Sequence, residues 1–167
     1  MFHYLKFMAF HMMALAIAFC VSMGDSAITI ALISLIAFFI ISDGVLGDDV
    51  SEPTYKFPQF LTTQLWMALP LMFFVTFVCV WQFASVDVFS YGATFQSLTG
   101  IDILAVRADT HPMHYVSLSL LLALSIGLIS TLVGHELTHR TWDPISMLIG
   151  RWLLAFSFDS NFSIEHV

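Results

Sequence analysis

Charge is what this sequence has least of. Of its 167 residues, 5 are Lys or Arg and 12 are Asp or Glu, so charged side chains make up 10% of the chain, against about 25% in an ordinary globular domain. So few charges cannot coat a soluble globule, which excludes a cytosolic enzyme. The apolar share of 59% excludes a disordered tail. At a net charge of −7, a nucleic-acid partner is also excluded, because a phosphate backbone needs a basic face.

Cysteine is scarce as well. The two cysteines, Cys20 and Cys79, lie in apolar runs and are interpreted as small buried hydrophobic residues rather than redox centres or metal ligands. A disulfide scaffold is thereby excluded. What the chain has in quantity is apolar side chains, so lipid is the expected solvent for most of its surface.

Long apolar runs take up most of the chain. A hydrocarbon core about 30 Å thick needs roughly 20 apolar helical residues, whose backbone groups are satisfied within the helix. The sequence predicts one membrane domain, residues 1–167, with four spans at about 7–24, 26–42, 60–84 and 115–134. Residues 23–26 predict a tight connection, so that the first two spans form a hairpin. Pro70 predicts a kink in the third span.

A further apolar stretch, residues 145–158, is too short to span and contains Arg151. Asp143 and Pro144 before it are typical of a helix start, as the N-cap and the first-turn residue. Residues 43–58 and 87–114 are expected to be loops. We therefore expect an all-α polytopic membrane bundle of four transmembrane helices and a short re-entrant or interfacial helix.

The few basic residues predict the orientation of the bundle. With four spans, one side of the membrane holds Lys6, Lys56, Arg140 and Arg151, and the other side holds Arg107. Basic residues favour the cytoplasmic side, so the side with four of them is expected to be cytoplasmic.

Polar residues at the end of the fourth span carry the main functional signal. The run over residues 134–140 reads GHELTHR. His135 and His139 are four residues apart, so a helix places both imidazoles on one face, about 6 Å apart at Cβ and within reach of one metal ion. Ionisable residues where a span meets the interface are costly unless they serve a function. The plain alternative is a solvated helix end that happens to hold two histidines.

A second motif, NFSIEHV, occupies residues 161–167. The run over 134–140 resembles the first histidine box of the membrane-bound alkane hydroxylases, within the wider histidine-box desaturase and hydroxylase superfamily. The second motif resembles the start of the next box, which usually reads Glu-His-x-x-Gly-His-His. The acidic loop over 43–49 is similar to the loop that follows the second span of that family. Glu136 and Glu165 favour alkane or related xylene monooxygenases over the acyl-lipid desaturases.

The resemblance implies a non-haem monooxygenase with two iron ions, which hydroxylates the terminal carbon of an alkane with O2. Electrons would come from a rubredoxin-type donor and its NAD(P)H reductase, and the apolar substrate would arrive from membrane lipid. By position, His135, His139 and His166 correspond to iron ligands. Glu136 and Glu165 correspond to catalytic groups that bridge the metal or orient imidazoles. The implied location is a bacterial inner (plasma) membrane, with the histidine cluster on the cytoplasmic side.

Three histidines are too few donors for two irons, and the rest of the second box and the whole third box do not occur in the sequence. We therefore expect an N-terminal fragment of a larger hydroxylase that is inactive alone and binds at most one divalent metal ion weakly.

Two other classes of function fit part of the pattern. HELTH over residues 135–139 also matches a membrane zinc metalloprotease, with Glu136 as general base and Glu165 as a third ligand. The other class is a membrane protein that is not an enzyme. Among the remaining histidines, we expect His11 to be neutral and hydrogen-bonded between helices, and His111 and His114 to anchor the far interface.

Overall fold

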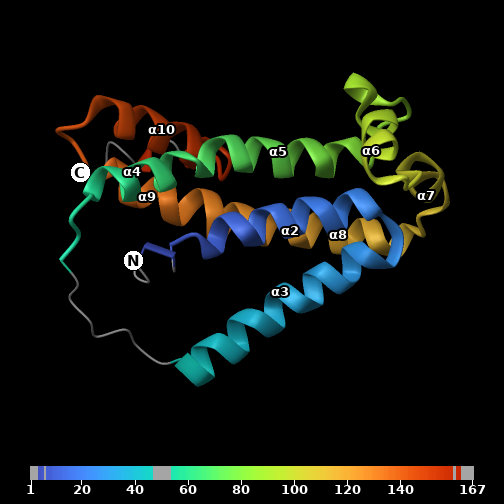
Figure 1. The fold of residues 1–167 in the computed structure, drawn as a ribbon, viewed down its shortest axis with the longest axis horizontal. Helices are drawn as coiled ribbons and strands as arrows, with labels where there is room; N and C mark the ends of the chain where they lie inside the picture. The colour runs from blue at the N-terminus through green and yellow to red at the C-terminus, as the bar shows by residue number, and fades with distance from the viewer. Residues whose placement is uncertain (1–3, 6, 47–53, 160, 163–167) are drawn as a thin grey trace. The chain divides into compact units, whose positions relative to one another are not determined.

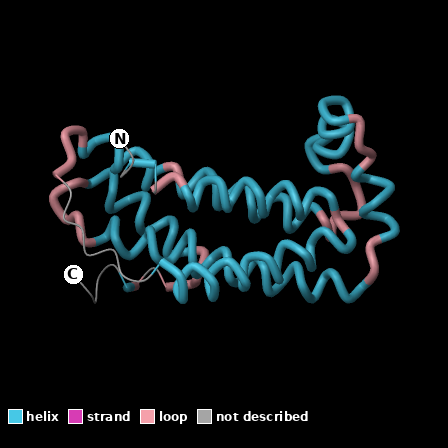
Figure 2. The backbone as a smooth tube through the Cα atoms, turned by 60° about the horizontal axis from the view of Figure 1, so that its bottom comes forward, coloured by secondary structure: helices cyan, strands magenta, loops and turns pink. Residues whose placement is uncertain are grey.

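The computed structural model describes residues 4–5, 7–46, 54–159 and 161–162. Within those ranges every regular element is helical, so the all-α prediction is confirmed (Figure 2). The elements are α2 (Ala9–Met23), α3 (Asp25–Leu46), α4 (Pro58–Trp66), α5 (Ala68–Trp81), the 3-10 turn η1 (Val88–Ser90), α6 (Tyr91–Thr99), α7 (Ile103–Asp109), α8 (Pro112–Ser125), the π-helical turn η2 (Ile126–Thr131), α9 (Leu132–Thr138) and α10 (Pro144–Ala155) (Figure 1).

Three helical runs are long and apolar enough to cross a membrane, namely Asp25–Val45, Pro58–Trp81 and Pro112–Thr138. They correspond to the second, third and fourth predicted spans. The first predicted span corresponds to α2, which has 15 residues. At 1.5 Å per residue α2 is about 22 Å long, shorter than a hydrocarbon core of about 30 Å. The length of α2 therefore does not decide whether it crosses the membrane, and a crossing by α2 stays a prediction.

The helices are grouped into two compact units. One contains the described parts of residues 1–15, 53–75 and 123–167, and the other contains those of 16–52 and 76–122. The first unit buries Met72, Ile129, Leu137 and Leu153, and the second buries Ile28, Trp81, Leu118 and Leu121. Each unit therefore has an apolar interior of its own.

The surface of α3 is as apolar as an interior. Ile30, Ile33, Ile40 and Ile41 are 61–68% exposed. Burying an apolar side chain of this size is worth about 1.5–3 kcal/mol relative to leaving it in water, so a row of such residues indicates a lipid environment. The three long apolar helices and this outer surface fit a membrane protein.

The predicted tight connection between the first two helices is confirmed. α2 ends at Met23, and Gly24 and Asp25 turn the chain with φ values of 68° and 43°. A Cβ atom on Gly24 would lie 3.1 Å from Val106 Cγ1 and 3.3 Å from Thr110 Oγ1. The positive φ and the close approach together require glycine at this position.

The predicted loop after the second span begins later than expected. α3 continues to Leu46 and includes Asp43 and Gly44, which were assigned to the loop over 43–58. The preceding apolar run lets the helix continue, because one acidic residue and one glycine at an exposed end cost little helix stability. Residues 47–53 of this loop lie outside the described residues.

Pro70 was predicted to kink the third span, and the structure has a one-residue interruption of the α-helix about one turn before it. The helix is interrupted at Met67, between α4 and α5, and Pro70 itself lies inside α5. Proline has no N–H, so the carbonyl of Trp66 loses its usual partner four residues on. The interruption falls where that hydrogen bond is lost.

Residues 87–114 were expected to be a loop, and this expectation is wrong, because η1, α6, α7 and the start of α8 lie there. Local hydrogen bonds stabilise these short helices. The Asp102 carboxylate accepts from the N–H groups of Leu104 and Ala105, which caps α7. Gly100, with φ 78°, ends α6. Helices of seven to nine residues are too short to show an apolar period in the sequence.

Candidate metal centre

The helix that carries the histidine pair changes its winding just before the motif. α8 is followed by the π-helical turn η2, and then by α9. A π-turn accommodates an extra residue, so the side chains that follow are rotated around the axis relative to a continuous α-helix. η2 therefore sets the direction in which His135 and His139 point. The sequence analysis missed it, since π-helices have no reliable sequence signal.

Two glycines bring α9 and α10 into close contact. Figure 1 shows the two helices side by side. A Cβ atom on Gly150 would lie 3.0 Å from the carbonyl oxygen of Gly134, and one on Gly134 would lie 3.1 Å from the carbonyl oxygen of Gly150. The buried hydroxyl of Ser130 in η2 donates to the carbonyl of Leu153 in α10 at 2.7 Å. α10 therefore supports the helix that carries the motif.

The predicted helix start at Asp143 is confirmed. Its carboxylate accepts from the N–H groups of Ile145 and Ser146, and from the Ser146 hydroxyl at 2.6 Å. The hydrogen bond from the Ser146 hydroxyl is the main reason that the pKa of Asp143 is lower than usual. The indole N–H of Trp66 in α4 donates to the same Ser146 hydroxyl at 2.9 Å. α4, α10 and the loop after α9 are thus linked.

The structure brings His135 and His139 together. Their Nε2 atoms lie 2.9 Å apart and their ring centroids 4.7 Å apart. His135 is partly buried and His139 is exposed. Two nitrogens, each about 2.1 Å from one ion, lie about 3 Å apart when they subtend a right angle. Without an ion, one imidazole N–H can donate to the other ring at the same distance. The distance between the two Nε2 atoms therefore fits a chelate and a hydrogen bond equally well.

Glu136 points to a different partner. Its carboxylate lies 3.6 Å from Arg140 Nη2, and its side chain is 58% exposed. Arg140 Nη1 in turn donates to Thr62 Oγ1 in α4 at 2.8 Å. Glu136 thus belongs to a chain of polar contacts beside the histidine pair. A zinc protease base would have to leave Arg140 to act at the metal.

Phe162 connects the second motif to the first. Its ring centroid lies 4.8 Å from that of His135. Glu165 and His166 follow three and four residues later, but they lie outside the described residues. The structure therefore places His135 and His139 side by side, and the role of these two residues and of His166 and Glu165 at a metal stays a prediction.

The described residues fit one metal ion only in part. Among them, no group of three or more His, Cys, Asp or Glu side chains is close enough to hold an ion. The pair supplies two imidazole nitrogens, which are suitable donors for iron or zinc. Any further donors for one ion, and all donors for a second, have to come from outside the described ranges.

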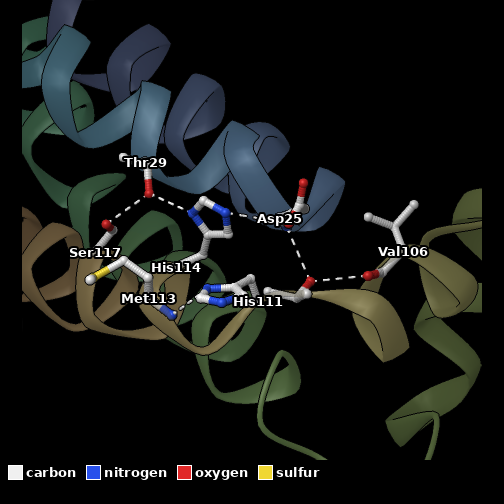
Figure 3. A network of polar contacts seen from close by, with 8 residues as sticks. Asp25, Thr29, Val106, His111, Met113, His114 and Ser117 are labelled. Atoms are coloured by element: carbon white, nitrogen blue, oxygen red, sulfur yellow. Dashed lines mark hydrogen bonds and ion pairs between the residues drawn. The ribbon is translucent and has the colours of Figure 1, made fainter.

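His11 and His114 have structural partners away from the pair. Nε2 of buried His11 lies 3.0 Å from the carbonyl oxygen of Gln64, which confirms the predicted hydrogen bond between helices. His114 lies between Thr29 Oγ1 at 2.8 Å and Asp25 Oδ1 at 3.3 Å (Figure 3). This network joins the start of α3 to the start of α8. The sequence analysis expected an interfacial anchor here, but it missed the partners of His114.

Comparison with models of protein families, with curated proteins and with solved structures finds no match for this chain.

Proposed function

We propose that this chain is the N-terminal part of a histidine-box membrane monooxygenase of the alkane hydroxylase kind. The observation that carries the proposal is the chelate-like pair of Nε2 atoms, 2.9 Å apart, at the end of an apolar helix long enough to cross a membrane. The contact of Phe162 with His135 supports it, because Phe162 belongs to the second motif and brings the start of that motif to the pair. A related xylene-type hydroxylase has the same features.

In the proposed arrangement α2 is a fourth span. His11 in α2 bonds to Gln64, one to two turns after the start of the Pro58–Trp81 helix, and Gln82, just after the end of that helix, donates to the carbonyl of Val21. These two contacts tie the opposite ends of α2 to positions near the opposite ends of a span. α10 is the re-entrant or interfacial helix. The histidine pair then lies on the cytoplasmic side of a bacterial inner membrane, where a rubredoxin-type donor can reach it.

His135 and His139 would hold one iron ion through their Nε2 atoms, with His166 as a further ligand. When bound, iron supplies the activation of O2 that hydroxylation of a C–H bond needs. The residues of this chain position and insulate the site. Glu136 is paired with Arg140 in the structure, so its carboxylate would have to leave Arg140 to orient an imidazole. The apolar helices exclude water and admit an alkane from the bilayer.

Metal titration of the purified chain in phosphatidylcholine nanodiscs tests the proposal. We expect at most one Fe(II) per chain under anaerobic conditions. His135→Ala and His139→Ala should each weaken its affinity by at least tenfold, because a two-nitrogen chelate becomes a single ligand. His111→Ala is the matched control, since this exposed histidine lies in the other unit and should leave affinity unchanged.

Three results would count against the proposal. Iron affinity that is unchanged in both ligand variants would remove the metal centre. Two irons bound per chain would contradict the expectation that this part of the protein lacks donors. Zinc-dependent peptide cleavage that Glu136→Gln abolishes, with zinc still bound, would favour the protease. In a chain that also carries the remaining boxes, we expect oxidation of octane to 1-octanol that depends on His135.

A further inference from the structure

The segment between the helices that end at Trp81 and begin at Pro112 contains an unusually uncharged stretch. Residues 88–101 contain no Asp, Glu, Lys or Arg. Within this stretch, Phe89 is 88% exposed and Leu98 is 81% exposed. A connection that lies fully in water would normally turn polar side chains outward. Thr94, Gln96, Ser97 and Thr99 of α6 are exposed as well, so it is the positions of Phe89 and Leu98 that favour an apolar environment.

The backbone conformation at Phe89 and Ser90 folds the Phe89 side chain back against α5. Phe89 and Ser90 have φ values of 56° and 53°, in a region that bulky residues rarely adopt. This turn places the Phe89 ring 6.0 Å from that of Phe77, one helical turn before the end of α5 at Trp81. The ring thus lies beside the membrane helix and not beyond its end.

α6 turns one face toward the end of α2. The hydroxyls of Tyr91 and Ser22 are 2.6 Å apart, and the rings of Phe95 and Phe19 are 6.1 Å apart. Phe19 is itself 52% exposed, one turn before α2 ends. Leu98 follows Phe95 by three residues and so continues the same helix face. This face extends beyond α2, and among the residues that the structure describes none covers Leu98.

Arg107 holds α7 against the end of α5, where Trp81 lies. The guanidinium of Arg107 lies 4.0 Å from the centre of the Trp81 ring and donates to the Trp81 carbonyl at 3.0 Å. α7 carries Arg107 with the exposed Asp102 and Asp109, so it belongs on the aqueous side.

We infer that residues 88–99 form an interfacial anchor whose Phe89, Phe95 and Leu98 face lies among lipid acyl chains just below the headgroups. The occupant of this face is bilayer lipid. Because the stretch has no charge, insertion depends on apolar contact and not on the charge of the lipid. The inference rests on the crossing of a bilayer by the helices that flank the segment, and it is independent of the metal centre.

Nitroxide labels at single cysteines test this depth. The background is Cys20→Ala with Cys79→Ala, and the protein is reconstituted in phosphatidylcholine nanodiscs. Leu98→Cys is compared with Ile33→Cys on the exposed side of α3 and with Ala105→Cys on α7. Power saturation then compares access of O2, which concentrates in lipid, with access of a water-soluble nickel chelate.

We expect the ratio of O2 to nickel access at Leu98 to be several-fold higher than at Ala105 and to approach that at Ile33. Adding phosphatidylglycerol should leave this ratio unchanged. A Leu98 ratio equal to that at Ala105 would overturn the inference, because the face would then lie in water. Low access of both reagents would also overturn it, in favour of a second copy of the chain. If the ratio of O2 to nickel access at Ile33 were as low as in water, α3 would not cross the membrane, and the inference would lose the membrane crossing on which it rests.

Discussion

Gly150 shows how one missing side chain can hold two helices together. Its Cβ position lies 3.0 Å from the Gly134 carbonyl oxygen and 3.0 Å from Thr138 Cγ2, so α10 approaches α9 at backbone contact. Gly150→Ala should therefore destabilise the protein by about 1–3 kcal/mol, since a backbone oxygen cannot move aside as a flexible side chain can. Chemical unfolding in detergent, followed by circular dichroism, measures this change.

Gly127→Ala is the matched control. Gly127 lies in η2 of the same unit, with no atom within 4 Å of its Cβ position. This substitution should be neutral or should stabilise by up to about 1 kcal/mol through helix propensity. Equal losses for both glycines would show that the contact between α9 and α10 does not determine the effect, because helix propensity alone predicts a gain from Gly to Ala.

Single residues also show what the sequence could predict. Asp143 was predicted as a cap, because its partners Ile145 and Ser146 are two and three residues away. The contact of His114 with Thr29 joins residues that are 85 positions apart, and nothing local to either residue announces it. His135 and His139 were predicted as a pair for the same local reason as Asp143, since helical spacing alone brings them together.

Among the elements, α6 has its start held in place by one ionised side chain, Asp87. Asp87 accepts hydrogen bonds from the Trp81 indole at 3.1 Å, and from the N–H groups of Gly92 and Ala93 at 2.8 and 3.1 Å. Burial opposes the ionisation of Asp87, but these donors and Arg107 outweigh it and lower the pKa of Asp87. The carboxylate therefore holds the start of α6 against the end of α5.

The lowered pKa of Asp87 predicts a pH dependence. In the unfolded chain an Asp titrates near about 3.9, so ionised Asp87 stabilises α6 above that pH, and this stabilisation is lost as the pH falls through the lower folded value. Asp87→Asn should increase amide exchange across residues 88–99 at pH 7. After correction for intrinsic exchange rates, the difference from the unsubstituted protein should shrink at pH 3.

Asp109→Asn, at the exposed end of α7, is the control and should leave exchange in α6 unchanged. If the difference between Asp87→Asn and the unsubstituted protein persisted at pH 3, packing of the side chain and not its charge would hold α6. The sequence analysis assigned this segment to a loop, because a helix of nine residues with a distant carboxylate partner has no periodic signal of its own.

For the whole molecule, the sequence predicted the long helices better than it predicted their number of crossings. Runs such as Pro112–Thr138 are recognised by length and composition, which need no knowledge of neighbours. α2 is ambiguous because its 15 residues are fewer than a span needs, so that its contacts have to decide. These contacts, from His11 to Gln64 and from Val21 to Gln82, join residues more than 50 positions apart.

The side of the membrane on which the N-terminus lies therefore tests the four-span arrangement. In the background without Cys20 and Cys79, single cysteines at the exposed positions Leu5, Ala105 and Trp142 can be labelled with an impermeant maleimide in bacterial spheroplasts. Pro112–Thr138 separates Ala105 from Trp142, so these two positions should label on opposite sides whether or not α2 crosses the membrane.

We expect Ala105→Cys to label in intact spheroplasts, because its side of the membrane carries one basic residue, Arg107. Leu5→Cys should label with Trp142→Cys only after permeabilisation, since α2 adds one crossing to the three long helices and makes the total between these two positions even. Labelling of Leu5→Cys together with Ala105→Cys would mean three crossings, with α2 lying along the membrane surface.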